Sequence, residues 1–132
     1  MSERKVRILL AKLGEGHKET SQSLARNFSE AGFEVIYTEL QQPEAIVSAA
    51  VQESVDHIGV TLLPGADTQA FAEIKRLLVK ENSDHITITA GGFLDKSEIA
   101  LLKDMGVMEF FPKGTPFDDL IAWSKKHIRQ KT

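Results

Sequence analysis

Along this chain, short continuous apolar runs alternate five times with segments in which apolar residues recur at helical spacing. Five short apolar runs have the length of β-strands, at residues 6–12, 34–38, 57–62, 85–90 and 107–111. After each run, apolar residues recur every three or four positions, which predicts amphipathic helices at residues 21–31, 43–51, 67–82, 96–105 and 116–129. Strands that alternate with helices of this length form parallel sheets. The pattern therefore predicts an α/β protein.

The length of the chain selects among α/β architectures. Five strand–helix units in 132 residues suit a flavodoxin-like, doubly wound five-stranded parallel sheet with strand order 2-1-3-4-5. A closed eight-fold barrel needs roughly twice this length. The sequence contains no linker or low-complexity segment, so residues 1–132 are expected to form a single domain.

The composition excludes several kinds of site and partner. The chain has no cysteine, which rules out disulfides, thiolate metal sites and a cysteine nucleophile. The net charge is -3 and acidic and basic residues are interspersed, so we expect no nucleic-acid partner. No apolar stretch approaches the roughly 20 residues of a membrane span, and the N-terminus lacks the apolar region of a signal peptide. We therefore expect no membrane association and a cytoplasmic location.

Small residues and one histidine follow the predicted strands. In an open parallel sheet, the loops after the strands gather at one edge, where ligands bind. Glu15 and His17 follow the first strand, 61–66 end the third, Gly91 and Gly92 follow the fourth, and 111–116 end the fifth. Glycines at such positions let a flat ligand approach the backbone closely. This arrangement predicts a long, narrow groove lined by backbone, with a histidine at one end.

The four histidines are not expected to meet. His57 and His85 begin the third and fourth predicted strands at the opposite edge of the sheet, where we expect both to be solvated. His127 lies in the last predicted helix, so a zinc site with several histidines is excluded. His17 remains a candidate metal ligand whose ring Glu15 could orient, although a lone loop histidine is more often an ordinary surface residue.

Other catalytic motifs are missing from the sequence. It has no phosphate-binding loop ending in Gly-Lys-Ser/Thr, no Gly-x-Ser-x-Gly elbow, and no third glycine to complete a dinucleotide fingerprint after Gly14 and Gly16. A phosphate-accepting receiver domain would carry an acidic pair after the first strand and an aspartate at the end of the third. The third strand instead ends in Thr61-Leu62-Leu63, which makes that interpretation weak.

Three motifs in order resemble one family. The chain resembles the cobalamin-binding domains of the base-off/His-on type, as in methylmalonyl-CoA mutase, whose signature is Asp-x-His-x-x-Gly, then Ser-x-Leu, then Gly-Gly. Here the first motif is Glu15 to Thr20, the second is Thr61-Leu62-Leu63, and the third is Gly91-Gly92. Glutamate, threonine and threonine replace the family's aspartate, glycine and serine at positions 15, 20 and 61. The resemblance covers nearly the whole chain.

The resemblance implies a cofactor and a set of residues that hold it. His17 would be the lower axial ligand of cobalt, Glu15 would hydrogen-bond its far ring nitrogen, and Lys12 would lie behind Glu15. The nucleotide tail of adenosylcobalamin would lie in a slot closed by Phe111 and Thr115. The implied cofactor-binding set is Lys12, Glu15, Gly16, His17, Lys18, Thr20, Thr61, Leu63, Gly65, Gly91, Gly92, Phe111 and Thr115.

The resemblance also implies a function shared with another chain. Mutases of this family rearrange the carbon skeleton of an acyl-CoA substrate inside a barrel above the corrin, and 132 residues leave no room for that barrel. The chain would therefore be the small subunit of an acyl-CoA mutase, inactive alone, with the substrate held by a large partner subunit. Two alternatives stay open: a corrinoid carrier or sensor without isomerase activity, and a diverged domain that has lost cobalamin.

Overall fold

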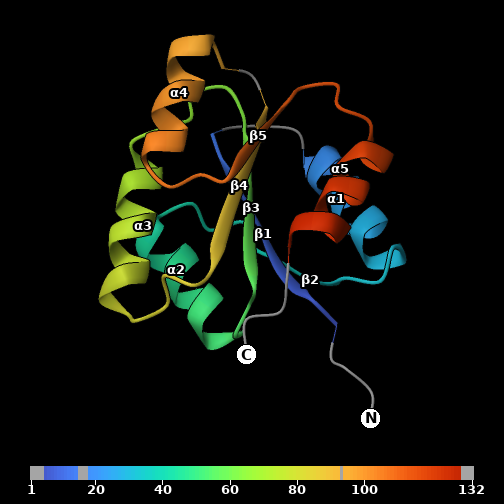
Figure 1. Cartoon of the computed structure of the whole chain (residues 1–132), viewed down its shortest axis with the longest axis horizontal. Helices are drawn as coiled ribbons and strands as arrows, with labels where there is room; N and C mark the ends of the chain where they lie inside the picture. Colours follow the sequence, from blue (N-terminus) through green and yellow to red (C-terminus); the bar gives the residue numbers. More distant parts are fainter. Residues whose placement is uncertain (1–4, 15–17, 93, 129–132) are drawn as a thin grey trace.

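The computed structural model describes residues 5–14, 18–92 and 94–128. One five-stranded parallel sheet has the order β2-β1-β3-β4-β5, as the sequence predicts (Figure 1). The strands are β1 Arg7–Leu13, β2 Glu34–Tyr37, β3 His57–Leu62, β4 Thr87–Gly92 and β5 Glu109–Pro112. The helices are α1 Lys18–Glu30, α2 Pro43–Gln52, α3 Ala70–Lys80, α4 Lys96–Asp104 and α5 Phe117–His127.

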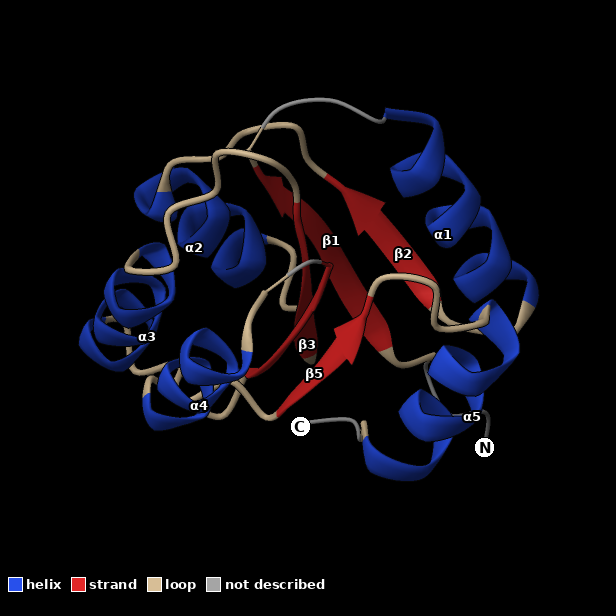
Figure 2. Cartoon of the chain, turned by 90° about the horizontal axis from the view of Figure 1, so that it is seen from above, coloured by secondary structure: helices blue, strands red, loops and turns tan. Residues whose placement is uncertain are grey.

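The helices form a layer on each face of the sheet. Figure 2 shows α2, α3 and α4 on one side of the strands, and α1 and α5 on the other. None of the helices in the described part of the chain is both long enough and apolar enough to cross a membrane.

Most element ends differ from the predicted ranges by one to three residues, and two of these differences have a clear local cause. Residues 85 and 86 belong to a turn, in which the Ile86 amide donates to the Ser83 carbonyl, so β4 begins at Thr87 and extends to Gly92. The third helix begins at Ala70, because the Asp67 carboxylate accepts a hydrogen bond from the Gln69 amide and holds the preceding residues in a turn. β3, in contrast, has the predicted bounds.

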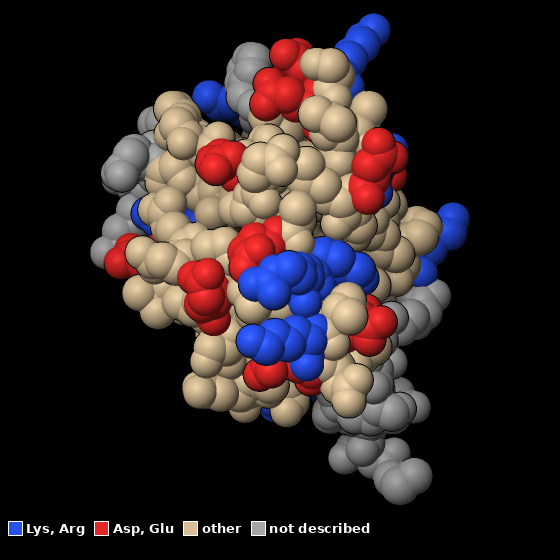
Figure 3. Space-filling model, turned by 90° about the vertical axis from the view of Figure 1, so that its left-hand side faces the viewer, with Lys and Arg blue, Asp and Glu red and all other residues tan. Residues whose placement is uncertain are grey.

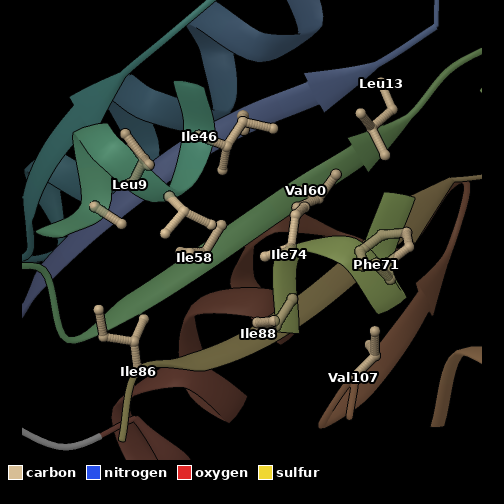
Figure 4. Packing of buried hydrophobic residues seen from close by; sticks show 14 of the residues in the cluster. Leu9, Leu13, Ile46, Ile58, Val60, Phe71, Ile74, Ile86, Ile88 and Val107 are labelled. Carbon is tan, nitrogen blue, oxygen red and sulfur yellow. The ribbon is translucent and has the colours of Figure 1, made fainter. Parts of the chain in front are cut away.

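The main core lies between the sheet and helices α2, α3 and α4. Figure 4 shows alternate residues of the central strands, such as Ile58, Val60 and Ile88, pointing toward Ile74 and Phe71 of α3. All of these side chains are buried. Aliphatic and aromatic side chains fill this face at the close packing usual in protein interiors.

The outer surface of this helical layer carries both signs of charge. Figure 3 shows basic side chains at the centre of the face with acidic side chains around them. Arg76 forms an ion pair with Glu73, and Lys103 Nζ lies 3.5 Å from Glu109 Oε1. The hydrogen bond from Arg76 lowers the pKa of the Glu73 carboxyl group.

Candidate functional site

The sheet face toward α1 and α5 differs in chemistry from the face toward the main core. On β3 it presents His57, Gly59 and Thr61, and the paired β4 residues are Thr87, Thr89 and Gly91. A sheet covered on both faces usually presents apolar side chains to both layers. Here β3 and β4 carry small or polar side chains instead. These side chains do not fill the space between the sheet and helices α1 and α5.

A cavity of about 800 Å³ occupies this space. It extends from the loops after β3, β4 and β5 to His57 and Ile128 near the other edge of the sheet. Apolar side chains of α1 and α5, including Leu24, Phe28 and Leu120, form its helical wall. Small-molecule sites usually have volumes of about 300–1,000 Å³, so the cavity is large enough for an extended organic ligand.

Two glycines keep the sheet wall of the cavity flat. A Cβ atom at Gly59 would lie 3.1 Å from Leu10 Cδ2 and 3.8 Å from Thr89 Oγ1. A Cβ atom at Gly91 would lie 3.2 Å from the Phe111 carbonyl oxygen. Without side chains at these two positions, a planar group can approach the backbone of the central strands.

His57 corrects one sequence prediction. We expected a solvated residue at the start of the third strand, but the His57 side chain is only 1% exposed. Its Nδ1 atom lies 2.6 Å from Thr87 Oγ1, and its Nε2 atom lies 2.8 Å from Thr89 Oγ1. The prediction was wrong because the helical layer of α1 and α5 extends over the start of β3 and covers the His57 side chain. His85, one strand further along, is exposed as expected.

Hydrogen bonds hold the end of β1 next to the loop after β3, whose Leu63 lines the cavity. The Gly14 amide donates to Gln41 Oε1 at 2.8 Å, and Gln41 Nε2 donates back to the Gly14 carbonyl at 3.0 Å. The Leu63 amide also donates to the Leu13 carbonyl at 2.8 Å. These bonds fix the end of β1 beside the loop after β3.

Most of the predicted site residues that the structure describes lie around the cavity. Seven of them contribute to its lining: Thr61, Leu63, Gly65, Gly91, Gly92, Phe111 and Thr115. Lys12 pairs with Thr61 across β1 and β3 but does not belong to the lining. Lys18 and Thr20 lie in α1, where their side chains are not described, and Glu15, Gly16 and His17 lie outside the described residues.

The sequence analysis missed the deeper part of the cavity. His57, Gly59 and Thr89 line it, together with apolar residues of β1, α1 and α5. The available signal was the alternation in β3 and β4, where every second residue is small or polar and the residues between are apolar. Among the described residues, no three histidine or acidic side chains are grouped to hold a metal ion.

Comparison with known proteins agrees with this geometry. The B12-binding domain matches residues 6–121, which is most of the chain. The chain belongs to the B12-binding domain family. The family resemblance predicted from the three motifs is thereby confirmed, and the cavity lies on the sheet face that carries the second and third of these motifs.

Two relatives of this B12-binding domain are named as mutase small subunits. The 2-hydroxyisobutanoyl-CoA mutase small subunit of Aquincola tertiaricarbonis is 36% identical over 118 residues, covering 88% of this chain and 87% of the relative. The pivalyl-CoA mutase small subunit of Xanthobacter autotrophicus is 30% identical over 120 residues, covering 89% and 80%. The similarity therefore extends over most of both chains.

A solved structure shows the same fold. A cobalamin-binding protein from Desulfitobacterium hafniense DCB-2 superposes with a TM-score of 0.75 at 16% identity, over 96% of this chain and 60% of that one. At this level of identity the likeness concerns the arrangement of the sheet and helices. It confirms the predicted flavodoxin-like architecture of the B12-binding domain.

Proposed function

We propose that this chain is the small subunit of an adenosylcobalamin-dependent acyl-CoA mutase and that it holds the cofactor for a large partner subunit. The observation that carries the proposal is the cavity between the sheet and helices α1 and α5. It opens among the loops that carry the family motifs and has the volume of a small-molecule site. The two mutase small subunits that match most of this chain support the same function.

The residues around the cavity fit the nucleotide tail of cobalamin. Its walls combine apolar side chains with the bare backbone at Gly59 and Gly91, which suits a flat aromatic base. We assign Thr61, Leu63 and Gly65 to one wall near the mouth, and Gly91 and Gly92 to the backbone surface. Phe111 and Thr115 would close the slot on the side of β5.

His17 is proposed as the lower ligand of cobalt. It follows Gly14 by three residues, and Gly14 is anchored by Gln41 beside the loop after β3. A ligand histidine usually donates its second ring N–H to a carboxylate or carbonyl, and Glu15 is the carboxylate we assign to this role. Lys12, Gly16, Lys18 and Thr20 would complete the surface beneath the corrin.

The division of work between the two chains follows from the chemistry. When bound, adenosylcobalamin supplies an organic radical through homolysis of its cobalt–carbon bond. This chain would bind the lower face of the cofactor, orient it through His17, and keep water away from the nucleotide tail. The acyl-CoA substrate would be held above the opposite face by the large subunit.

A spectroscopic titration tests cofactor binding. The purified chain is titrated with hydroxocobalamin and adenosylcobalamin while the UV–visible spectrum is recorded. We expect a base-off/His-on spectrum that is lost in His17→Ala and kept in His85→Ala, a control at an exposed histidine. A wild-type spectrum that never changes would contradict the proposal, and an unchanged His17→Ala spectrum would contradict the role of His17.

A reconstitution tests the mutase assignment. The loaded chain is mixed with the candidate large subunit from its own source and offered 2-hydroxyisobutanoyl-CoA or pivalyl-CoA, with products separated by chromatography. We expect rearrangement only when both chains are present. Turnover by the large subunit alone, at the same rate, would show that this chain does not carry the cofactor for it.

A further inference from the structure

The inner end of the cavity has a polar floor in mainly apolar surroundings, where the Ser124 hydroxyl also lines the cavity and donates to the Leu120 carbonyl at 2.7 Å. His57 and Thr89 both line it, and their side chains are joined by the 2.8 Å contact between Nε2 and Oγ1. The neighbouring lining residues Ile8, Phe28 and Ile128 are apolar. Buried polar groups are expensive unless they are hydrogen-bonded, so their position in an apolar slot needs an explanation.

The histidine and its two threonines form a pair of coupled hydrogen bonds. A neutral imidazole has one donor and one acceptor nitrogen. If Nε2 donates to Thr89 Oγ1, the Thr89 hydroxyl group can donate a hydrogen bond to a ligand. If Nε2 accepts from Thr89, the hydroxyl oxygen can accept from a ligand. Because Thr87 can satisfy Nδ1 in either tautomer, the floor can serve as a donor or as an acceptor.

Gly59 gives a ligand access to this hydroxyl group. It is the β3 residue paired with Thr89, and its missing Cβ would have lain 3.8 Å from Thr89 Oγ1. Thr87, in contrast, is bonded to the same histidine but does not line the cavity. The two threonines therefore differ in one respect that matters here: only Thr89 faces the slot.

We propose that His57 and Thr89 make this chain select among corrinoids by the base of the nucleotide tail. This inference rests on the proposed function, since it assumes that the tail occupies the slot. The six-membered ring of the base is the part farthest from its attachment to the ribose, so it reaches deepest. In 5,6-dimethylbenzimidazole that edge carries two methyl groups, whereas in adenine it carries a ring nitrogen with an amino group on the adjacent carbon. The polar floor favours the corrinoid with adenine.

The test compares three corrinoids and matched threonine variants. Binding of hydroxocobalamin, its adenine analogue and cobinamide, which has no base, is measured by isothermal titration calorimetry. We expect the wild type to bind the adenine analogue about 3- to 10-fold more tightly than hydroxocobalamin, which is the contribution of one hydrogen bond. In Thr89→Val the two affinities should become equal. Thr87→Val also removes a hydroxyl group bonded to His57, but its affinity ratio should stay within about 2-fold of the wild-type ratio.

Two further measurements separate the possible failures. Thr89→Ser keeps a hydroxyl group and should keep the ratio, and circular dichroism checks that each variant is folded. Cobinamide should bind all variants equally, because it lacks the base that reaches the floor. A wild type that binds no corrinoid would overturn the proposed function together with this inference. A wild type that binds all three, with a base preference that Thr89→Val does not change, would overturn this inference alone.

Discussion

Gly14 offers a direct test of how the end of β1 packs against the loop after β3. Its backbone has φ +96°, and a Cβ atom there would lie 2.5 Å from the Leu63 carbonyl oxygen and 2.6 Å from that of Pro64. Gly32 has a similar φ of +103°, but a Cβ atom there would have nothing within 4 Å. Gly14→Ala and Gly32→Ala therefore share the backbone strain and differ in the contact with the loop after β3.

The magnitudes follow from these two positions. A non-glycine residue in the left-handed region costs about 1–2 kcal/mol. Alanine also restricts the unfolded chain, which returns about 0.4–1 kcal/mol. We therefore expect Gly32→Ala to lower the free energy of unfolding by roughly 0 to 1.6 kcal/mol. At Gly14 the clash with two backbone carbonyls adds the cost of overpacking, about 1–3 kcal/mol, because neither carbonyl can move without shifting the loop.

Urea denaturation of the two variants measures this difference. The midpoint should fall in both, with unchanged dependence on denaturant, and it should fall further in Gly14→Ala. Corrinoid affinity should also decrease only in Gly14→Ala, since the clash displaces the loop after β3, whose Leu63 lines the cavity, and Gly14 directly precedes Glu15 and His17 in the sequence. Equal destabilisation of the two variants would show that the loops after β1 and β3 are not packed as described.

Three further predictions concern the slot, the main core and a helix terminus. Gly59→Ala should change stability little, because the atom nearest to the added methyl group is the flexible end of the Leu10 side chain. It should weaken corrinoid binding at least about 10-fold in calorimetry, since the methyl group would occupy the slot. Phe71→Ala should lower the free energy of unfolding by about 3–5 kcal/mol in urea and leave corrinoid affinity unchanged, because Phe71 is fully buried on the opposite face of the sheet. The amide of Glu98 lowers the pKa of the Asp95 carboxyl group below its ordinary 3.8, so the ionised form stabilises the start of α4. That contribution is present above pH 3.8 and lost as the pH falls through the lowered pKa. The difference in Tm between wild type and Asp95→Ala should therefore be constant above pH 3.8 and shrink as the pH is lowered further, as measured by thermal unfolding.

Local pattern was sufficient for the fold and for the mouth of the candidate site. The alternation of strand and helix periods, together with the rule that parallel strands direct their following loops to one edge, led to the correct sheet order and to the residues at the mouth, such as Thr61 and Gly91. These features depend on residues close in sequence and on general constraints of chain connection.

The depth of the slot depended on tertiary structure. The sequence shows that His57, Gly59 and Thr89 alternate with apolar residues, but it does not show which helices cover that face or how far they extend. The pairing of β3 with β4 joins His57 to Thr89, and the packing of α1 and α5 over the start of β3 buries the pair. Burial is a property of contacts between segments far apart in the chain, so a residue that looks like a solvated strand end by local pattern became the floor of the cavity.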